Sequence, residues 1–143
     1  MGVTDADNQT VVFKERLKKI YRYSQSHLSE GLCPTGKVLA PTLDRWSMFC
    51  LFNLAYYETL RFGELRKKID GISPRMLAVT LRRLEEHGFV ARKAYSEVPP
   101  RVEYRLTDFG LELSRRLSDL TEWFLGYFEK LPAFEHFNEK IEK

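Results

Sequence analysis

The sequence is poor in the residue types that build disulfide-linked or metal-dependent scaffolds. Among its 143 residues are two cysteines, Cys33 and Cys50, which are too few for a disulfide framework, and we expect them to be separate thiols. The three histidines show no metal-ligand spacing with one another or with the cysteines. A chain of this length can bury one core without such cross-links, so no metal is expected.

Long apolar runs are also missing. No run approaches the roughly 18 to 20 residues that a membrane span requires. Residues 1–10 contain two aspartates and lack the basic cluster and apolar stretch of a secretory signal. We therefore expect a cytoplasmic protein with no membrane partner.

Motifs of catalysis are absent as well. The sequence has no phosphate-binding glycine loop, no nucleophile elbow and no paired metal motif. It predicts neither enzyme activity nor a cofactor.

The net charge of +3 is too small to indicate nucleic-acid binding, but the charge is unevenly distributed. Residues 61–105 carry 11 Lys and Arg against 6 Asp and Glu, whereas the remainder carries 12 against 14. One segment is therefore at +5 and the rest of the chain at −2.

Hydrophobic periodicity predicts a mainly helical fold with a small β-hairpin. We expect an amphipathic helix over about 10–28, a break at 31–34, a helical segment from about residue 35 or 36, a core helix over 44–57 surrounded by others, a short helix carrying Phe62, Leu65 and Ile69, a helix over 73–87, strands over 89–95 and 101–106, and a long helix after Thr107. This order is typical of a winged helix-turn-helix.

Capping chemistry supports these boundaries. Asp44, Ser73 and Thr107 are predicted N-caps, because their side-chain oxygens can accept from unpaired amides, and Pro74 suits the first helical position. Asp70-Gly71 predicts the turn between two helices, and Gly88 predicts the end of the second.

The helix over 73–87 has a leucine stripe on one side and arginines on the other. Outward residues near the start of such a helix can enter the major groove, where arginine donates two hydrogen bonds to guanine. The alternative is that these side chains form a solvent-exposed helix face that does not contact DNA. The predicted DNA contacts on this helix are Ser73, Arg75, Ala78, Val79, Arg82 and Arg83.

The hairpin is the predicted wing, stiffened by Pro99-Pro100. Wings lie along the minor groove, which attracts Arg and Lys, and Arg92, Lys93 and Arg101 are the candidates, although an ordinary surface hairpin would have the same sequence. Other cations would hold phosphates without reading sequence, namely Lys67, Lys68 and Arg45.

The apolar stripe of the last helix is wider than one small domain covers, which favours a homodimer. The predicted dimer contacts are Phe13, Leu17 and Ile20 of the first helix and Leu113, Leu117, Leu120, Trp123, Phe124 and Tyr127 of the last. The predicted organisation is an N-terminal extension over 1–30, a DNA-binding and dimerisation domain over 31–131 and a tail over 132–143.

Between residues 33 and 123 the chain resembles the HxlR-type family of winged helix-turn-helix transcriptional regulators. The matching pieces, in the family's order and spacing, are Cys33-Pro34, Trp46, residues 61–66, 71–74, 81–88 and 97–104, and Leu106-Thr107. The chain departs from the family at residues 43–45, which read Leu-Asp-Arg in place of a Gly-Gly-Lys run, and in the length of the segment before Cys33.

The resemblance implies a cytoplasmic bacterial or archaeal homodimer that binds operator DNA and represses or activates nearby genes. Because the two recognition helices of a dimer would enter successive major grooves, we expect a near-palindromic operator. It also implies a possible effector, because some similar proteins sense electrophiles, quinones or hypochlorite through the cysteine that matches Cys33. An inert thiol is the alternative for Cys33, and Cys50, in the apolar core helix, is expected to be structural.

Two further alternatives stay open. Trp46, Phe49, Phe52, Tyr56 and Tyr57 could line a cavity for an aromatic effector, although aromatic residues at helical spacing are more often packing. A winged-helix module that binds proteins and has no specific affinity for DNA would also fit the sequence.

Overall fold

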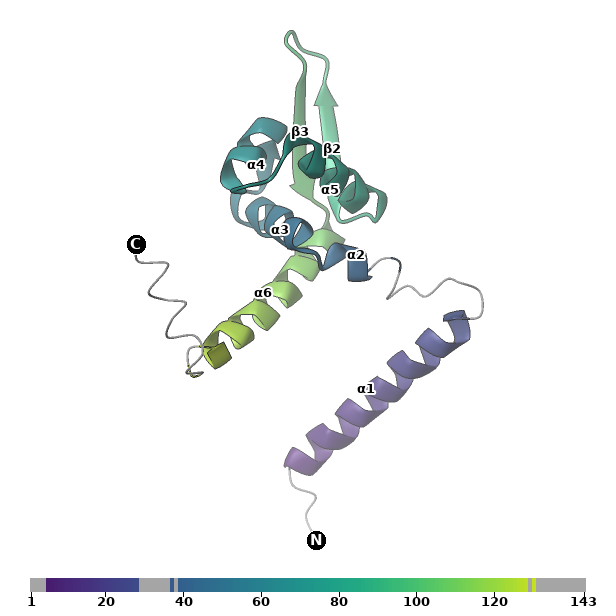
Figure 1. Ribbon diagram of the computed structural model, residues 1–143. Coiled ribbons are helices and arrows are strands. Elements are labelled where there is room, and N and C mark those ends of the chain that lie inside the picture. Colours follow the sequence, from purple (N-terminus) through teal and green to yellow (C-terminus); the bar gives the residue numbers. More distant parts are fainter. Residues whose placement is uncertain (1–4, 29–36, 38, 129, 131–143) are drawn as a thin grey trace. The chain divides into compact units, whose positions relative to one another are not determined.

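The computed structural model describes residues 5–28, 37, 39–128 and 130 (Figure 1). The chain divides into two compact units, Met1–Leu43 and Asp44–Lys143. Among the described residues, no helix combines the length and apolarity needed to cross a membrane.

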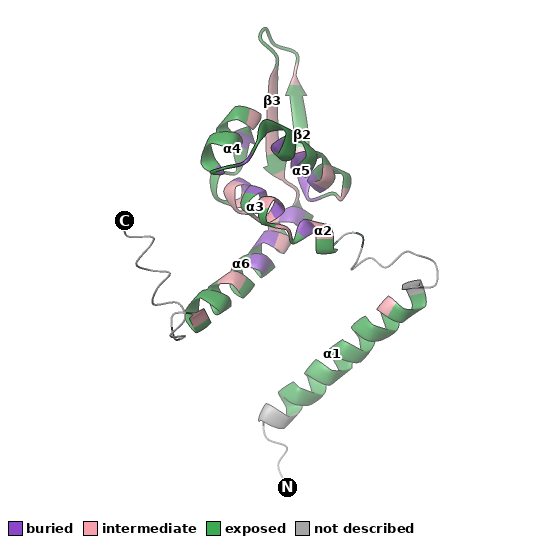
Figure 2. Cartoon of the chain, in the orientation of Figure 1, coloured by how far each residue is buried: buried purple, intermediate pink, exposed green. Residues whose placement is uncertain are grey.

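The first unit contains α1 (Asp5–Leu28) and the short α2 (Ala40–Thr42). The predicted amphipathic helix is confirmed, and it begins at Asp5 rather than near Thr10. Its side chains are exposed over nearly its whole described length, as Figure 2 shows. The expected helix start at residue 35 or 36 lies outside the described residues, as does Cys33.

The second unit is a bundle of helices beside a small sheet (Figure 1). All strand pairs are antiparallel, and the strand order is β1-β3-β2. The elements are α3 (Arg45–Tyr57), β1 (Thr59–Arg61), α4 (Phe62–Lys68), α5 (Pro74–Glu86), β2 (Val90–Tyr95), β3 (Arg101–Leu106) and α6 (Asp108–Phe128). The fold is thus a winged helix-turn-helix, mainly helical, with the predicted hairpin and one strand, β1, that the sequence analysis did not predict.

The core forms around α3, which packs against α4, α5, α6 and the sheet. Leu51 and Leu54 of α3 and Leu77, Leu81 and Leu84 of α5 are almost completely buried. Burial of each such side chain stabilises the fold by about 2 kcal/mol. The leucine stripe of α5 therefore anchors this helix on the core.

The prediction that α3 is covered on all sides is wrong in part. Ser47, Cys50, Leu51 and Leu54 are buried, but Phe49 and Tyr57 are exposed, and Tyr56 is 80% exposed. Neighbouring elements cover one side of α3, so these three aromatic side chains face solvent, whereas Trp46 and Phe52 are half-buried.

The predicted N-caps of α3, α5 and α6 are confirmed. Asp44 Oδ1 accepts from the amides of Trp46 (3.0 Å) and Ser47 (3.2 Å), and Ser73 Oγ accepts from the Met76 amide (3.1 Å). Thr107 Oγ1 accepts from the Gly110 amide (3.0 Å). Gly71 and Gly88 have φ of +76° and +77°, a region that favours glycine, and they form the turns on either side of α5.

Candidate nucleic-acid interface

The short turn between α4 and α5 places the start of α5 at the surface. The buried side of α5 holds Leu77, Thr80, Leu81 and Leu84, because the 3.6-residue repeat brings these positions together. Five predicted contacts, Ser73, Arg75, Ala78, Val79 and Arg82, are exposed along α5. The structure thus gathers two guanidinium groups, two small apolar side chains and a hydroxyl on one accessible surface.

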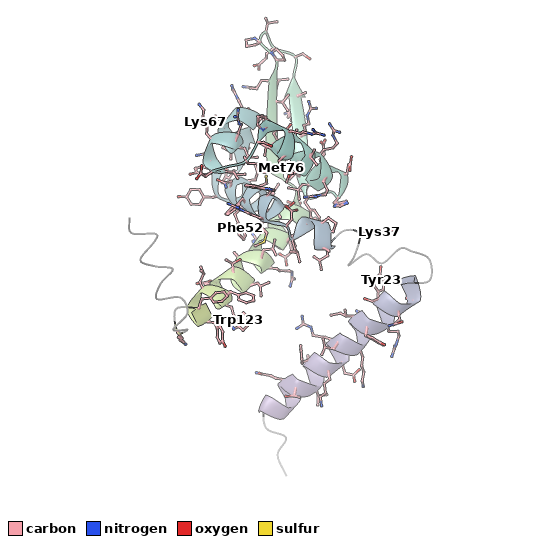
Figure 3. All side chains as sticks on the ribbon, in the orientation of Figure 1. Tyr23, Lys37, Phe52, Lys67, Met76 and Trp123 are labelled. Atoms are coloured by element: carbon pink, nitrogen blue, oxygen red, sulfur yellow. The ribbon has the colours of Figure 1, made fainter. Side chains whose placement is uncertain are left out.

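Met76 shares this accessible end of α5 and is labelled in Figure 3. It was not predicted as a contact. Its signal was positional, since it precedes the buried Leu77 and lies 100° from it around the helix.

Arg83 differs from the other arginines of α5. Its Nη2 donates to Asp44 Oδ2 at 2.5 Å and to Ser47 Oγ at 2.9 Å, both at the start of α3. A guanidinium held by a carboxylate of its own chain is less available to a phosphate. Sequence analysis could not find this pair, because 39 residues separate its members.

The predicted phosphate-contacting cations lie on α4 and at the start of α3. Lys67 is exposed on α4 (Figure 3), and the Nζ of its neighbour Lys68 lies 3.6 Å from the ring centre of Tyr57. The guanidinium carbon of Arg45 lies 4.6 Å from the ring centre of Trp46. These contacts with aromatic rings orient two of the three cations while leaving them exposed.

The hairpin of β2 and β3 holds its cations on two faces. Lys93 pairs with Glu103 and Tyr95 with Arg101 in the register, so these side chains share one face, whereas Arg92 lies on the opposite face. The predicted wing cations therefore do not form one patch. Arg61 and Arg105, which were not predicted as contacts, belong to the face of Lys93. The alternation along β3 would have indicated Arg105, whereas Arg61 lies on the unpredicted strand β1.

Arg101 is held by several neighbours within the wing. Its guanidinium carbon lies 4.0 Å from the ring centre of Tyr95, and its nitrogens lie 3.1 Å from Glu97 and 3.5 Å from Glu103. On the same face of the hairpin, Lys93 Nζ of β2 lies 4.8 Å from the centre of the same tyrosine ring. The loop end of the wing is therefore stiffened by a cluster of charges around Tyr95.

Cys50 is enclosed by the core. The pKa of its thiol is raised from 9.0 to about 12, mainly by burial and also by the nearby Asp44 carboxylate, while Arg83 partly offsets these effects. The thiol is protonated at neutral pH and therefore a poor nucleophile. This agrees with the predicted structural role of Cys50.

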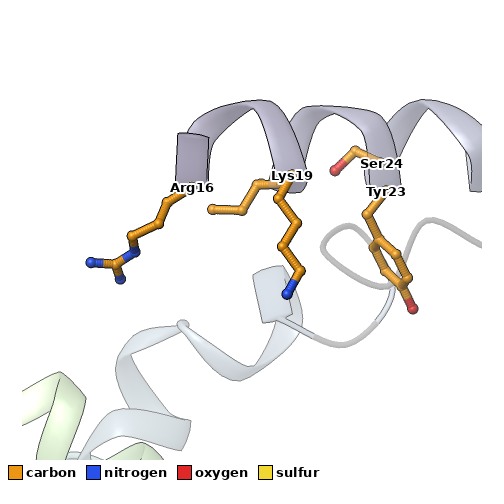
Figure 4. Close-up of a pocket in the computed structure, with 5 residues that line it drawn as sticks. Arg16, Lys19, Tyr23 and Ser24 are labelled. Atoms are coloured by element: carbon orange, nitrogen blue, oxygen red, sulfur yellow. The ribbon is translucent and has the colours of Figure 1, made fainter. Parts of the chain in front are cut away.

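No enclosed effector site stands out among the described residues. Figure 4 shows a hollow lined by Arg16, Lys19, Ile20, Tyr23 and Ser24, all within three turns of α1, and it is a groove on one helix surface. Of the aromatic residues proposed for a cavity, Tyr56 and Tyr57 are exposed, with ring centres 4.7 Å apart. Within the described part of the chain, no group of three His, Cys, Asp or Glu side chains could hold a metal ion.

The apolar side of α6 changes from buried to exposed along the helix, as Figure 2 shows. Leu113 is half-buried and Leu117 is 5% exposed, so Leu117 packs within its own chain and is removed from the predicted dimer contacts. Leu120, Phe124 and Tyr127 are exposed, and Trp123 is 64% exposed (Figure 3). On α1, the three predicted contacts Phe13, Leu17 and Ile20 are also exposed.

Known proteins share this arrangement. A family model described as HxlR-like helix-turn-helix matches residues 42–132. An uncharacterised HTH-type transcriptional regulator, YtfH of Escherichia coli K12, is 44% identical over 99 residues, which are 69% of this chain and 78% of the relative.

Solved structures agree. A putative transcriptional regulator ytfH from Salmonella typhimurium superposes with a TM-score of 0.64 and 37% identity, covering 74% of this chain and 94% of the other. The redox regulator HypR in its oxidised form gives a TM-score of 0.57 and 36% identity, covering 64% of this chain and 93% of the other. The chain belongs to the HxlR-like helix-turn-helix family, whose members are DNA-binding transcriptional regulators and not enzymes.

Proposed function

We propose that the protein acts as a homodimer that recognises a near-palindromic operator, with the start of α5 in the major groove. The observation that carries this proposal is the exposed set on α5, in which Arg75 and Arg82 flank Ala78 and Val79. Arginines read guanine through paired hydrogen bonds, and small apolar side chains contact the thymine methyl group. Ser73, the N-cap of α5, would contact a phosphate as well.

Around α5, other cations have positioning roles. Lys67, Lys68 and Arg45 would contact phosphates, and Arg92 and Lys93 would contact the backbone or minor groove from the wing. Arg101 would reach DNA only by exchanging Glu97 and Glu103 for a phosphate. Arg83 faces the same competition from Asp44.

The dimer would use the exposed parts of two helices. Leu120, Trp123, Phe124 and Tyr127 form an apolar surface at the end of α6, a kind of patch that commonly marks a protein contact. Leu113 would extend this surface within α6, and Phe13, Leu17 and Ile20 of α1 are proposed as separate dimer contacts. Two subunits joined in this way would present their α5 helices to successive major grooves, roughly 34 Å apart.

An oxidant or electrophile is the proposed signal, and Cys33 the proposed sensor. Two structural relatives support this, one named a redox regulator, HypR, and the other solved after diamide treatment, YodB of B. subtilis.

We also propose that the protein acts in the cytoplasm, with the organisation of an extension over 1–30, a DNA-binding domain over 31–131 and a tail over 132–143.

The test is selection of DNA from a random library by the purified protein, followed by binding to the best site at two salt concentrations. Each neutralised phosphate contributes about −0.9 to the slope of log K against log salt, so an operator complex would be strongly salt-dependent. Repeating the measurement with a thiol oxidant, on the wild type and on Cys33→Ser, tests the sensor. Weak binding that does not depend on salt, with no enriched site, would instead favour a protein-interaction module.

A further inference from the structure

The contact between Arg83 and Asp44 links two elements with different tasks. Arg83 belongs to α5, one residue after Arg82, and Asp44 caps α3, the helix at the centre of the core. We propose that this contact positions the DNA-reading helix, so that Arg83 acts through the orientation of α5 and not by touching DNA. The inference rests on the proposed recognition of DNA by α5.

The Asp44 carboxylate uses both oxygens for different purposes. Oδ1 accepts from the backbone amides of Trp46 and Ser47, which fixes the carboxylate to the first turn of α3. Oδ2 accepts from the Ser47 hydroxyl at 2.6 Å and from Arg83 Nη2. The Ser47 hydroxyl also accepts from Arg83 Nη2, so one nitrogen of α5 is held by two oxygens of α3.

The remaining contacts of α5 define its place less sharply. Leu77, Leu81 and Leu84 attach it to the core, but hydrophobic burial has no preferred direction, and a helix can rotate or slide slightly on such a stripe. Hydrogen bonds require defined distances and angles. The guanidinium of Arg83 therefore restricts movements that the leucines tolerate.

Such movements matter for the residues that face DNA. Arg75 lies eight residues before Arg83, or about 12 Å along the helix axis, and Arg82 is the adjacent residue. A rotation of α5 about its axis displaces both outward side chains, and paired hydrogen bonds to guanine tolerate little displacement.

The side chains of Arg83 and Asp44 remain 30% and 34% exposed. An ion pair that water reaches contributes little to global stability. Positioning is thus a better account of the pair than stability, and the two accounts predict different results.

Asp44→Asn is the decisive variant. Asparagine still caps a helix well, so α3 keeps its N-cap, but the charge that holds Arg83 is lost. Removing a negative charge by itself strengthens binding to any DNA. Loss of positioning has the opposite effect and lowers affinity for the selected operator, where we expect a decrease of about tenfold. Affinity for an unrelated duplex should stay equal or rise.

Glu112→Gln is the matched control. Glu112 pairs with Arg116 at 2.7 Å within α6, so this variant also removes a carboxylate from an arginine. This ion pair lies within one helix and does not join two elements. Operator affinity should not fall. If Asp44→Asn binds the operator as tightly as the wild type, or more tightly, the proposal is overturned.

A second variant, Arg83→Met, leaves the Asp44 cap intact and completes a double-mutant cycle. Of the two single variants, one will bind the operator more weakly. The double variant should bind the operator no more weakly than that single variant, because the contact between the two residues can be broken only once. Additive losses would mean that the two residues act independently, which contradicts the proposal.

Hydrogen exchange separates this inference from the proposed function. In the protein without DNA, amides of residues 75–86 should exchange faster in Asp44→Asn than in Glu112→Gln. If the wild type selects no operator, the proposed function fails, and this measurement still decides whether the contact holds α5. Equal exchange in the two variants would overturn the positioning role.

Discussion

Gly110 lies so close to Phe89 that a β-carbon on Gly110 would fall 1.9 Å from the Phe89 carbonyl oxygen. The same oxygen accepts from the Thr107 amide at 3.1 Å, and Thr107 Oγ1 donates to the Gly88 carbonyl at 2.6 Å. The start of α6 and the residues after α5 are thus joined backbone to backbone. Only a residue without a side chain fits at position 110.

Gly110→Ala should therefore destabilise the fold. The atoms that would clash belong to the backbone, which cannot turn aside as a flexible side chain can. We expect a loss of at least about 1–3 kcal/mol in the free energy of unfolding, measured by urea denaturation. Because α6 carries the proposed dimer surface, self-association should weaken at the same time.

Gly126→Ala is the control within the same helix. A β-carbon there would meet no atom within 4 Å, and alanine is favoured over glycine in helices by up to about 1 kcal/mol. Stability should stay equal or rise. Equal losses in the two variants would show that the close approach to Phe89 does not limit position 110.

The sequence predicted best what depends on neighbouring residues. The caps Asp44, Ser73 and Thr107 and the turns at Gly71 and Gly88 follow from local hydrogen bonding and φ preference, and all five are present. The leucine stripe of α5 and the two wing strands follow from periodicity.

Features that depend on distant partners escaped prediction. Strand β1 has only three residues and exists because Leu60 pairs with Tyr104, far along the chain. The contact of Arg83 with Asp44 and the approach of Gly110 to Phe89 likewise need the assembled fold. Leu117 fits the apolar stripe of α6 by spacing, but whether a partner or the core covers it depends on where α6 leaves the core.

Arg75→Ala should reduce specificity for DNA. Loss of one arginine that reads guanine should cost about 1–3 kcal/mol on the operator and relax the preference at one base pair. Competition binding with operators changed at single positions measures both effects. Equal losses on the operator and on random DNA would contradict a base-reading role for Arg75.

Lys67→Ala provides the opposite pattern. Lys67 is exposed on α4, where a cation that contacts phosphate adds affinity without reading bases. The variant should weaken binding to operator and random DNA alike and should reduce the slope of log K against log salt by about 1. A loss confined to the operator would rule out a simple phosphate contact.

Stability at alkaline pH should depend on Cys50. The pKa of its thiol is about 12 in the folded protein, against an ordinary value of 9.0. Below about pH 9 the thiol is protonated in both states, and its contribution is complete. Between pH 9 and 12 the unfolded chain releases the proton and the folded protein retains it, so stability falls as pH rises.

Urea denaturation from pH 8 to 11 measures this dependence, with Cys50→Ala as the comparison because other groups titrate in the same range. Across pH 9 to 11 the free energy of unfolding of the wild type should fall more steeply, by up to about 1.4 kcal/mol per pH unit. Parallel curves would contradict the raised pKa. At pH 8 the buried thiol is protonated, so alkylation of Cys50 should require unfolding.

Trp123→Lys should disrupt the proposed dimer. The Trp123 ring lies 5.0 Å from that of Phe124 and 6.4 Å from that of Tyr127, so the three form one exposed aromatic surface. Burial of such a side chain in an interface is worth about 1.5–3 kcal/mol, and a lysine there would in addition lose hydration or repel its symmetry mate. Sedimentation equilibrium should show a shift toward monomer, and operator affinity should fall because each subunit then binds a half-site alone.

Tyr56→Lys, which changes a side chain 80% exposed on α3, should leave the molecular mass in solution unchanged. A dimer that persists in Trp123→Lys would place the subunit contact away from the end of α6.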